Sequence, residues 1–246
     1  MSVELATTDG VAVITLNRPE RKNAFNRRQY DDLAAHLDAV ATDENLRVAV
    51  LTGAGAAFSS GQDLKEMAEL AGQAASGSAT GGGGTTGFTV LLDALQRFPK
   101  PLVAAVNGVA VGIGMTILPY CDIVLVAESA RLRVPFSELG VPPEAGSSVL
   151  FAELIGWQRA AELLLTSRWI DATEAVDIGL ALRRCTDAEV LSEATALARE
   201  IASKSPYSTR VIKELMVAGR GSRSSDARAR EEALFAALFR SGGYGG

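Results

Sequence analysis

Residues 106–148 read VNGVAVGIGMTILPYCDIVLVAESARLRVPFSELGVPPEAGSS, and three structural signals follow one another along this segment. The apolar run 102–106 that leads into it predicts a buried strand. The small residues of 107–114 predict a sharp turn into a short helix, which Pro119 must end or bend because its ring cannot continue an α-helix. A further apolar run, 123–126, predicts another strand. Strand, turn, helix and strand in this order indicate a sheet-based core.

The flanking sequence continues this pattern on both sides. Two alternating runs, 3–6 and 11–16, flank Asp9-Gly10 and predict a β-hairpin, and 47–52 predicts a further strand. Beyond Val134 the apolar spacing is mostly helical. Helices are predicted at 149–155, 157–166, 172–178 and 190–201, after Ser205-Pro206, and at 227–240 (ARAREEALFAALFR), where Leu234, Phe235, Leu238 and Phe239 share one face. A strand-rich first half and a helical second half predict an α/β protein with a helical module at its end.

Composition excludes several classes of protein. The chain has 246 residues, of which 48% are hydrophobic, which is enough for a substantial core. Its 24 Lys and Arg against 29 Asp and Glu give a net charge of −5, so the electrostatic attraction that nucleic-acid binding requires is missing overall. No apolar run reaches the roughly 18–20 residues of a membrane span. Two cysteines exclude a disulfide framework and a four-thiolate zinc site, and they fit a reducing cytoplasm.

The single histidine narrows the chemistry further. Ser/His/Asp and Cys/His catalysis would have to use His36. It lies in a helical segment, however, whose buried stripe is marked by Tyr30, Leu33, Leu37 and Val40. We therefore expect His36 to be structural.

A low-complexity segment, AGQAASGSATGGGGTTG at 71–87, has almost nothing to bury. Its four consecutive glycines could suggest a phosphate cradle, but neither GxxxxGK[ST] nor GxGxxG occurs in the chain. A mobile loop is the expected structure.

Two segments, FSSGQDLKEM at 58–67 and NGVAVGIGM at 107–115, place small residues at a strand-to-helix turn. The first N–H groups of a helix have no partner within it and point toward whatever lies at that end. If two such ends converge, they form an oxyanion hole. Each segment taken alone is better explained as an ordinary, purely structural glycine-rich turn.

A third segment carries a carboxylate in a tight turn, Glu144 in PPEAGSS. Near apolar Phe136 and Leu139 it is a candidate general base whose pKa desolvation would raise. The alternative is a purely structural carboxylate stabilised by the N-terminus of the helix that follows. Spacing alone leaves both interpretations open.

Taken together, residues 106–148, FSSGQDLKEM and the loop RPERKNAF at 18–25 resemble the ordered motifs of the crotonase (enoyl-CoA hydratase/isomerase) superfamily. The resemblance extends from about Val3 to the last helix. It implies an α/β fold in which a spiral of β-β-α units, residues 1–195, is followed by a C-terminal helical trimerisation module, residues 196–246. It also implies an acyl-CoA thioester as substrate and assembly into a homotrimer or hexamer.

The chemistry common to that family is stabilisation of a thioester enolate by two backbone N–H groups. The resemblance places these donors at Gln62 and at Ile113, which follows Gly112. One such donor is worth about 2.7–4 kcal/mol. No metal or separate cofactor is implied, because CoA enters as part of the substrate.

Departures from the hydratase pattern indicate which reaction to expect. By the resemblance, two hydratase glutamates correspond to Thr116 and Phe136, and hydration needs such groups to activate water. PPEAGSS is instead similar to the matching segment of peroxisomal-type Δ3,Δ2-enoyl-CoA isomerases, whose glutamate moves a proton from C2 to C4. The resemblance thus assigns this proton transfer to Glu144, in a dry pocket walled by Phe136, Leu139 and Val141.

Other polar residues of these motifs receive lesser roles. Glu138 is the competing carboxylate. Asp63 is expected to cap a helix running through 64–70 and to shape the first oxyanion loop, whereas Asp122 and Cys121 are expected to be structural. By resemblance, the CoA moiety contacts Lys22, Ala24, Ser60, Leu64 and Lys65.

Two rival functions remain beside the isomerase. One is a hydratase or another crotonase-type lyase using Glu144 or Glu138, and the other is an acyl-CoA-binding protein without turnover. The ending GGYGG is no peroxisomal Ser-Lys-Leu signal, so a cytoplasmic location is expected.

Overall fold

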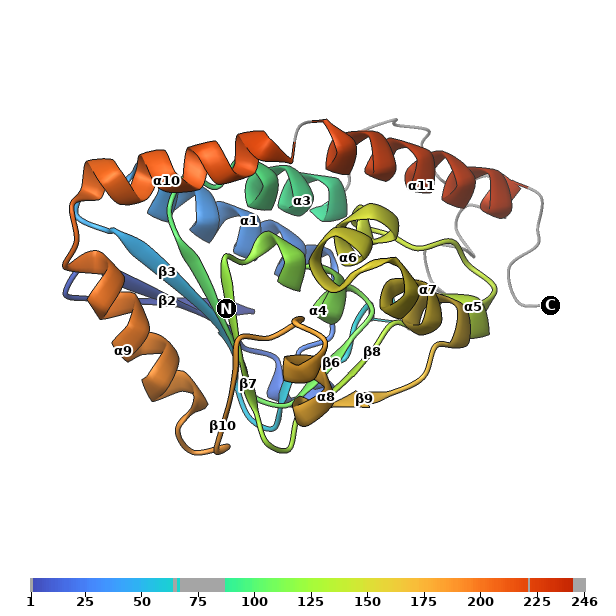
Figure 1. Ribbon diagram of the computed structural model, residues 1–246, viewed down its shortest axis with the longest axis horizontal. Helices are drawn as coiled ribbons and strands as arrows, with labels where there is room; N and C mark the ends of the chain where they lie inside the picture. Colours follow the sequence, from blue (N-terminus) through green and yellow to red (C-terminus); the bar gives the residue numbers. More distant parts are fainter. Residues whose placement is uncertain (1, 64–65, 67–86, 221, 241–246) are drawn as a thin grey trace.

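A six-stranded sheet forms one side of the core in the computed structural model, which describes residues 2–63, 66, 87–220 and 222–240 (Figure 1). Its strand order is β1-β2-β3-β5-β7-β10, and all neighbours are parallel except the β1–β2 hairpin. The strands are β1 (Val3–Thr8), β2 (Val11–Leu16), β3 (Val48–Gly53), β5 (Leu102–Val106), β7 (Ile123–Ala127) and β10 (Arg183–Cys185). Every residue of β3 and β5 is buried, as is typical of parallel strands covered on both faces.

A smaller sheet has the order β4-β6-β8-β9. Its strands are β4 (Ala57–Ser59), β6 (Val109–Val111), β8 (Arg131–Arg133) and β9 (Ile170–Asp171). β4, β6 and β8 are parallel, and β9 is antiparallel to β8. Buried residues of both sheets belong to one hydrophobic cluster, so the sheets share a core.

Helices pack around these sheets (Figure 1). α9 (Val190–Ala202) packs against β2, β3 and β5, and α1 (Arg27–Thr42) packs against β1, β2 and α3 (Gly87–Arg97). α10 (Pro206–Gly219) and α11 (Arg223–Arg240) form a long row along the top of the view, and α11 lies against α6 (Ser147–Ile155). The remaining elements are η1 (Pro19–Arg21), α4 (Ile113–Thr116), η2 (Leu118–Tyr120), α5 (Phe136–Leu139), α7 (Trp157–Thr166) and α8 (Ala172–Asp177).

Several predicted elements are confirmed. The hairpin turns at Asp9 and Gly10, whose φ values of 52° and 77° match the right-handed twist of the strands. The predicted stripe of α1 is buried, and His36 lies beside it with Nε2 3.3 Å from the Val3 carbonyl oxygen. The expected α/β architecture is therefore observed.

Three expectations need correction or fall outside the described ranges. Gly87, expected to be the last residue of a loop, is the first residue of α3. A side-chain carbon at this position would lie 2.8 Å from Asp31 Oδ1, so the close packing favours glycine. β10 and the four strands of the smaller sheet were not predicted, and β6 occupies part of segment 107–114, which was expected to form only a turn into a short helix. Residues 71–86 and most of the helix expected after Asp63 lie outside the described residues. α9 spans position 195, which the resemblance gives as the end of the core domain, and the division into two domains stays a prediction.

The last helix forms as predicted, and the structure shows which of its faces α11 buries. Leu234 is 62% exposed, whereas Ser224, Ala227, Arg228 and Glu231 are buried. These four positions share one helical face, so α11 meets the core through a mainly polar stripe. Side chains that can pair with polar groups on α3 and α6 outweigh the apolar pattern there.

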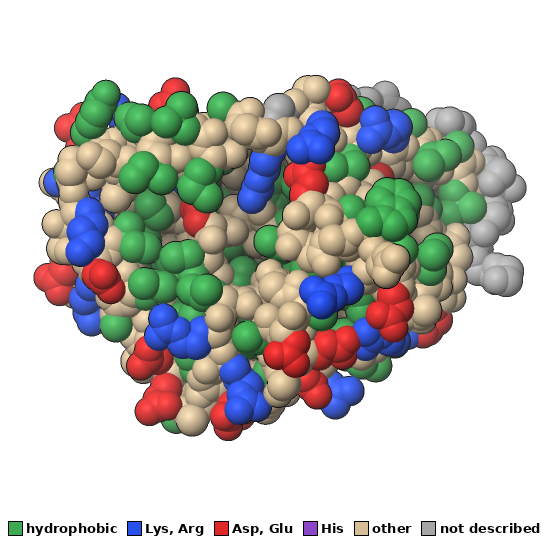
Figure 2. Space-filling model, in the orientation of Figure 1, with side chains coloured by type: hydrophobic (Ala, Val, Ile, Leu, Met, Phe, Trp, Pro, Cys, Tyr) green, Lys and Arg blue, Asp and Glu red, His purple; other side chains and the backbone are tan. Residues whose placement is uncertain are grey.

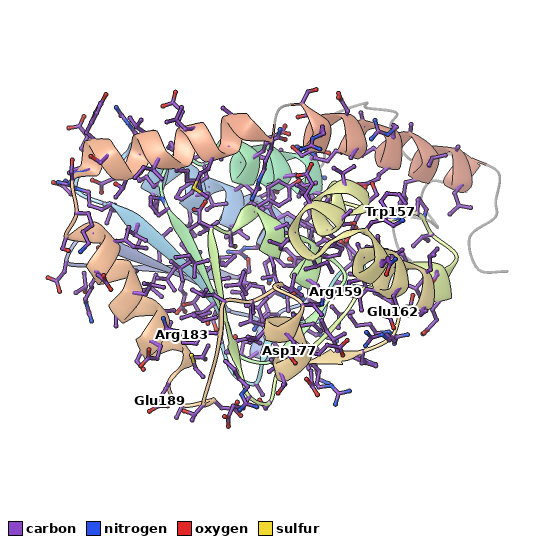
Figure 3. The ribbon with its side chains drawn as sticks, in the orientation of Figure 1. Trp157, Arg159, Glu162, Asp177, Arg183 and Glu189 are labelled. Atoms are coloured by element: carbon purple, nitrogen blue, oxygen red, sulfur yellow. The ribbon has the colours of Figure 1, made fainter. Side chains whose placement is uncertain are left out.

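Charged side chains lie mainly at the surface. Figure 2 shows acidic and basic groups interspersed on the visible face. In Figure 3, Arg159 and Glu162 on α7, Asp177 on α8 and Arg183 on β10 are labelled, and all four are exposed. No helix in the described ranges is long and apolar enough to cross a membrane.

Candidate active site

The two glycine-rich turns leave the same edge of the smaller sheet. β4 pairs in parallel with β6, with Ala57 opposite Val109 and Ser59 opposite Ala110. Because the carboxyl ends of parallel strands lie at one edge, the turn after β4 and the turn after β6 are neighbours. The sheet thereby brings together two segments separated by about 50 residues of chain.

At the point of contact both turns are made of glycine. Gly61 has a φ of +99°, and a side-chain carbon there would lie 3.0 Å from the Val111 carbonyl oxygen. Gly112 has a φ of +52°, and a side-chain carbon on it would lie 3.9 Å from Gly61 Cα and 4.0 Å from Glu144 Oε1. A left-handed backbone and close approach together require glycine. The same measurements place the Glu144 carboxyl beside the paired turns.

The backbone leaves the two expected donors unengaged. Ile113 is the first residue of α4, so its N–H has no partner within the helix. Phe25 and Gln62 form a parallel β-bridge, in which the Phe25 carbonyl accepts the Asp63 N–H and the Phe25 N–H donates to the Gly61 carbonyl. The Gln62 N–H therefore points away from Phe25. Among the described residues no acceptor is assigned to either N–H.

The loop at 18–25 is held against the first turn by Asn23. This residue is fully buried, and its side-chain amide donates to the Ala54 and Ala57 carbonyls at 2.9 and 2.7 Å. Its Oδ1 accepts the Arg18 N–H at 2.8 Å. Ser59 Oγ donates to the Asn23 carbonyl at 2.9 Å, which ties the loop to the end of β4.

This packing gathers several residues expected to contact CoA. The Ser60 N–H donates to the Lys22 carbonyl at 2.9 Å, and Ala24 is buried beside them. Lys22 is exposed, which leaves its ammonium available to a phosphate. Leu64 and Lys65 lie outside the described residues. Asp63, expected to cap the following helix, is paired with Arg18 at 3.1 Å.

Glu144 faces a pocket of about 440 Å³. The lining includes Gln62, Phe88, Pro143, Glu144, Glu231 and Phe235. Burial, and to a lesser extent the nearby Glu231 carboxylate, together raise the pKa of Glu144 from 4.5 to about 8. A carboxyl with this pKa can both accept and return a proton near neutral pH.

The turn that carries Glu144 is left-handed at two consecutive residues. Ala145 has a φ of 60° and Gly146 a φ of 72°. The Tyr120 hydroxyl donates to the Ala145 carbonyl at 2.7 Å, and the Ser147 N–H donates to the Glu144 carbonyl at 3.0 Å. A non-glycine residue in this region is strained, and these bonds offset the cost.

Three site residues were not found from the sequence. Tyr30 was assigned to the buried stripe of α1, yet its hydroxyl donates to Gln62 Oε1 and orients that side chain at the pocket. Tyr120 and Glu231 hold the Glu144 turn. No local pattern marks them, because each acts on a residue far away in the chain.

Other predicted residues lie elsewhere. Glu138 is paired with Arg133, and its side chain is 59% exposed. Asp122 accepts the Leu102 N–H at 2.7 Å and Lys213 Nζ at 2.8 Å, so its contacts are structural as expected. Cys121 is buried in the core.

The expected pocket walls are also distributed differently. Phe136 and Val141 line a neighbouring cavity of about 340 Å³, which shares Pro143 with the Glu144 pocket. Leu139 is 45% exposed. Phe88, Pro143 and Phe235 supply apolar surface beside Glu144 instead.

The arrangement combines the half-buried Glu144 side chain beside Gly112 with the backbone N–H groups of Gln62 and Ile113, which have no acceptor assigned among the described residues. Such N–H groups stabilise an oxygen that becomes negative when a neighbouring carbon loses a proton. Within 2–63, 66, 87–220 and 222–240, no group of three His, Cys, Asp or Glu side chains is placed to hold a metal ion.

Several known proteins are similar to this chain in sequence and in fold. The sequence profile described as enoyl-CoA hydratase/isomerase matches residues 6–243. The peroxisomal enoyl-CoA delta isomerase 3 of Mus musculus is 36% identical over 86% of this chain and 66% of its own length. Enoyl-CoA delta isomerase 2 of Rattus norvegicus is 37% identical over 86% of this chain and 54% of its own length. The chain thus spans about half to two thirds of these curated relatives.

A solved structure carries the other activity in its name. The enoyl-CoA hydratase of Mycobacterium marinum superposes with a TM-score of 0.80 at 44% identity, over 88% of this chain and 99% of that one. Similarity to isomerases and to a hydratase leaves the reaction to be argued from the site.

Proposed function

The chain belongs to the enoyl-CoA hydratase/isomerase family, and from this premise we propose that it is a Δ3,Δ2-enoyl-CoA isomerase. Its substrate is a 3-enoyl-CoA thioester and its product the conjugated 2-enoyl-CoA thioester. The observation that carries the proposal is the half-buried Glu144, whose carboxyl lies beside Gly112 and whose pKa is raised to about 8 by burial and by Glu231.

The reaction needs one proton carrier. The Glu144 carboxylate removes a proton from C2, and the electron pair moves into the thioester to form an enolate. The N–H groups of Gln62 and Ile113 hold the enolate oxygen, each worth about 2.7–4 kcal/mol. Glu144 then returns the same proton to C4, so the double bond moves from C3–C4 to C2–C3 and all atoms are conserved.

The positions corresponding to the two hydratase glutamates support isomerisation. Thr116 is buried and carries no carboxylate, and Phe136 lies in the neighbouring cavity. Apolar surface from Phe88 and Phe235 restricts water near the enolate. Water addition would need an activated water molecule, which a single shuttling carboxyl does not provide.

Hydration remains the second candidate because another carboxylate, Glu231, lines the same pocket. Its oxygens, however, accept the Gly146 and Ser148 N–H groups at 2.6 and 3.0 Å. These bonds stabilise the ionised form and engage the oxygens, which favours a fixed acceptor over a proton carrier.

The test is a spectrophotometric assay on the full chain. Purified protein is added to 3-enoyl-CoA thioesters of several chain lengths, and the ultraviolet absorbance of the conjugated product is followed. We expect conversion in the wild type, a loss of at least about 100-fold in Glu144→Gln, and no change in the matched variant Glu138→Gln.

The same assay separates the alternatives. Loss of absorbance from added 2-enoyl-CoA, with no product from 3-enoyl-CoA, would replace the isomerase with a hydratase. Binding of acyl-CoA without either reaction would indicate a non-catalytic acyl-CoA-binding protein. In all three cases, an exposed Lys22 near Ser60 is proposed to contact the CoA phosphates.

A further inference from the structure

The C-terminal helix α11 is fixed to the core by hydrogen bonds. Arg228 is buried, and its guanidinium donates to Asp93 Oδ1 and to Gln96 Oε1 on α3, each at 2.8 Å. Apolar packing is non-directional, whereas these bonds set both the rotation and the axial position of the helix. They determine where Glu231, one turn further along α11, must lie.

The Glu231 carboxylate accepts hydrogen bonds from the start of α6. The residue is 4% exposed, and its Oε2 accepts the Gly146 N–H at 2.6 Å. Its Oε1 accepts both the N–H and the hydroxyl of Ser148, at 3.0 and 2.5 Å. A carboxylate at this end of a helix also interacts favourably with the helix dipole.

The residues bonded to Glu231 belong to the turn that contains Glu144. Gly146 follows the strained Ala145, and the Ser147 N–H donates to the Glu144 carbonyl at 3.0 Å. Glu231 therefore holds peptide groups on both sides of Ser147, two residues from Glu144. If these hydrogen bonds are lost, the left-handed turn is free to relax and the Glu144 carboxyl moves away from Gly112.

Charged and titratable groups face the two carboxyls from several elements. Tyr30 on α1 lies close to Glu144, and Glu231 approaches it from α11. The positive charge of Arg230 on α11 favours the ionised form of Glu231. Glu232 also lines the pocket and lies 3.9 Å from the Arg228 guanidinium. Burial raises the pKa of both carboxyls, but three hydrogen bonds oppose this shift at Glu231, so the proton of the pair resides on Glu144.

We propose that Glu231 is a positioning residue for Glu144: its carboxylate clamps the 144–148 turn and sets a negative charge beside the Glu144 carboxyl, so proton transfer depends on the docking of α11. This inference rests on the proposed function only in assigning the proton transfer to Glu144.

A titration that needs no turnover tests the electrostatic part. The carboxyl carbon of Glu144 is followed by NMR in full-length protein labelled with ¹³C-glutamate, and the signal is assigned by its loss in Glu144→Gln. In Glu231→Gln, which keeps the length but loses the charge, we expect the pKa of Glu144 to fall by about one unit. The matched variant Glu200→Gln, on the exposed face of α9, should leave it unchanged. An unchanged pKa in Glu231→Gln overturns the proposal.

The variant Glu231→Asp tests the clamp. It keeps the charge but is one methylene too short to reach both Gly146 and Ser148. Because the negative charge is kept, we expect the pKa of Glu144 to fall less than in Glu231→Gln, while kcat for the isomerisation falls about 10- to 100-fold at unchanged KM. Unchanged kcat contradicts the clamp.

The outcomes keep the two proposals apart. If the wild type proves inactive but the titration shifts as expected, the isomerase assignment fails and the interaction of Glu231 with Glu144 stands. If Glu231→Gln does not fold, the Asp variant decides through its titration and kcat. A pKa of Glu144 that falls equally in Glu231→Asp and Glu231→Gln refutes a role for the charge.

Discussion

Replacing Glu144 with Gln should stabilise the protein increasingly as the pH rises. Burial and the neighbouring Glu231 raise the pKa of Glu144 from 4.5 to about 8 in the folded chain. At about 1.36 kcal/mol per pKa unit, this difference corresponds to at most about 5 kcal/mol. A glutamine of nearly the same shape never ionises and so escapes this cost.

The sign of this pH dependence follows from the number of protons bound by the folded and unfolded chains. Between pH 4.5 and 8 the folded chain holds the Glu144 proton and the unfolded chain releases it, so the free energy of unfolding falls as the pH rises. Below this window both states are protonated, and above it both are ionised. The advantage of Glu144→Gln over the wild type should therefore grow through the window and level off above pH 8.

Urea unfolding followed by circular dichroism measures the effect at pH 5, 6, 7, 8 and 9, at one protein concentration so that any assembly contributes equally. Subtracting the wild type from the variant cancels the titration of every other group. A difference that stays constant within about 1 kcal/mol from pH 5 to 9 would refute the buried, proton-holding Glu144.

Other consequences of the geometry can be checked separately. The isomerisation kcat/KM should rise about tenfold per pH unit below pH 8 and level off above it, because Glu144 must be ionised to accept a proton; a flat pH profile contradicts this base. Tyr120→Phe leaves the Ala145 carbonyl without its 2.7 Å partner and should cost about 1–3 kcal/mol in urea unfolding, whereas Tyr207→Phe, at an exposed position, should cost nothing measurable. Asn23→Ala removes a buried amide that binds two carbonyls and should destabilise by about 2–4 kcal/mol; a smaller loss would mean that the loop at 18–25 is held by other contacts. Gly112→Ala places a side chain at a φ of +52° and should lower kcat at least about tenfold by turning the Ile113 N–H; wild-type kcat would show that this N–H is not used.

The environment of Glu144 links stability to reactivity. Holding a carboxyl in an apolar pocket is costly, and the same desolvation brings its pKa close to the pH at which it must exchange protons. The strained turn at Ala145 is a second cost, which hydrogen bonds from the Tyr120 hydroxyl and to the Glu231 carboxylate offset. Residues outside the pocket therefore maintain an arrangement that the turn would not adopt alone.

Local sequence determined the β1–β2 hairpin, the glycine-rich turns and the strands of the six-stranded sheet other than β10. Apolar runs such as 102–106 and the Asp9-Gly10 turn act through neighbouring residues, so their conformations can be predicted without knowing the fold. The motifs around Gln62, Ile113 and Glu144 could also be recognised from the chain, although spacing alone left Glu144 open between a base and a structural carboxylate.

Only the tertiary structure decided how those motifs meet and what supports them. The β4–β6 pairing brings Gly61 to Gly112, and the Glu144 carboxyl lies beside both. Glu231 reads as an ordinary helix charge in the sequence, and its partners Gly146 and Ser148 lie more than 80 residues away. Helical periodicity describes one helix at a time, whereas a buried polar contact depends on two surfaces that are adjacent only after folding.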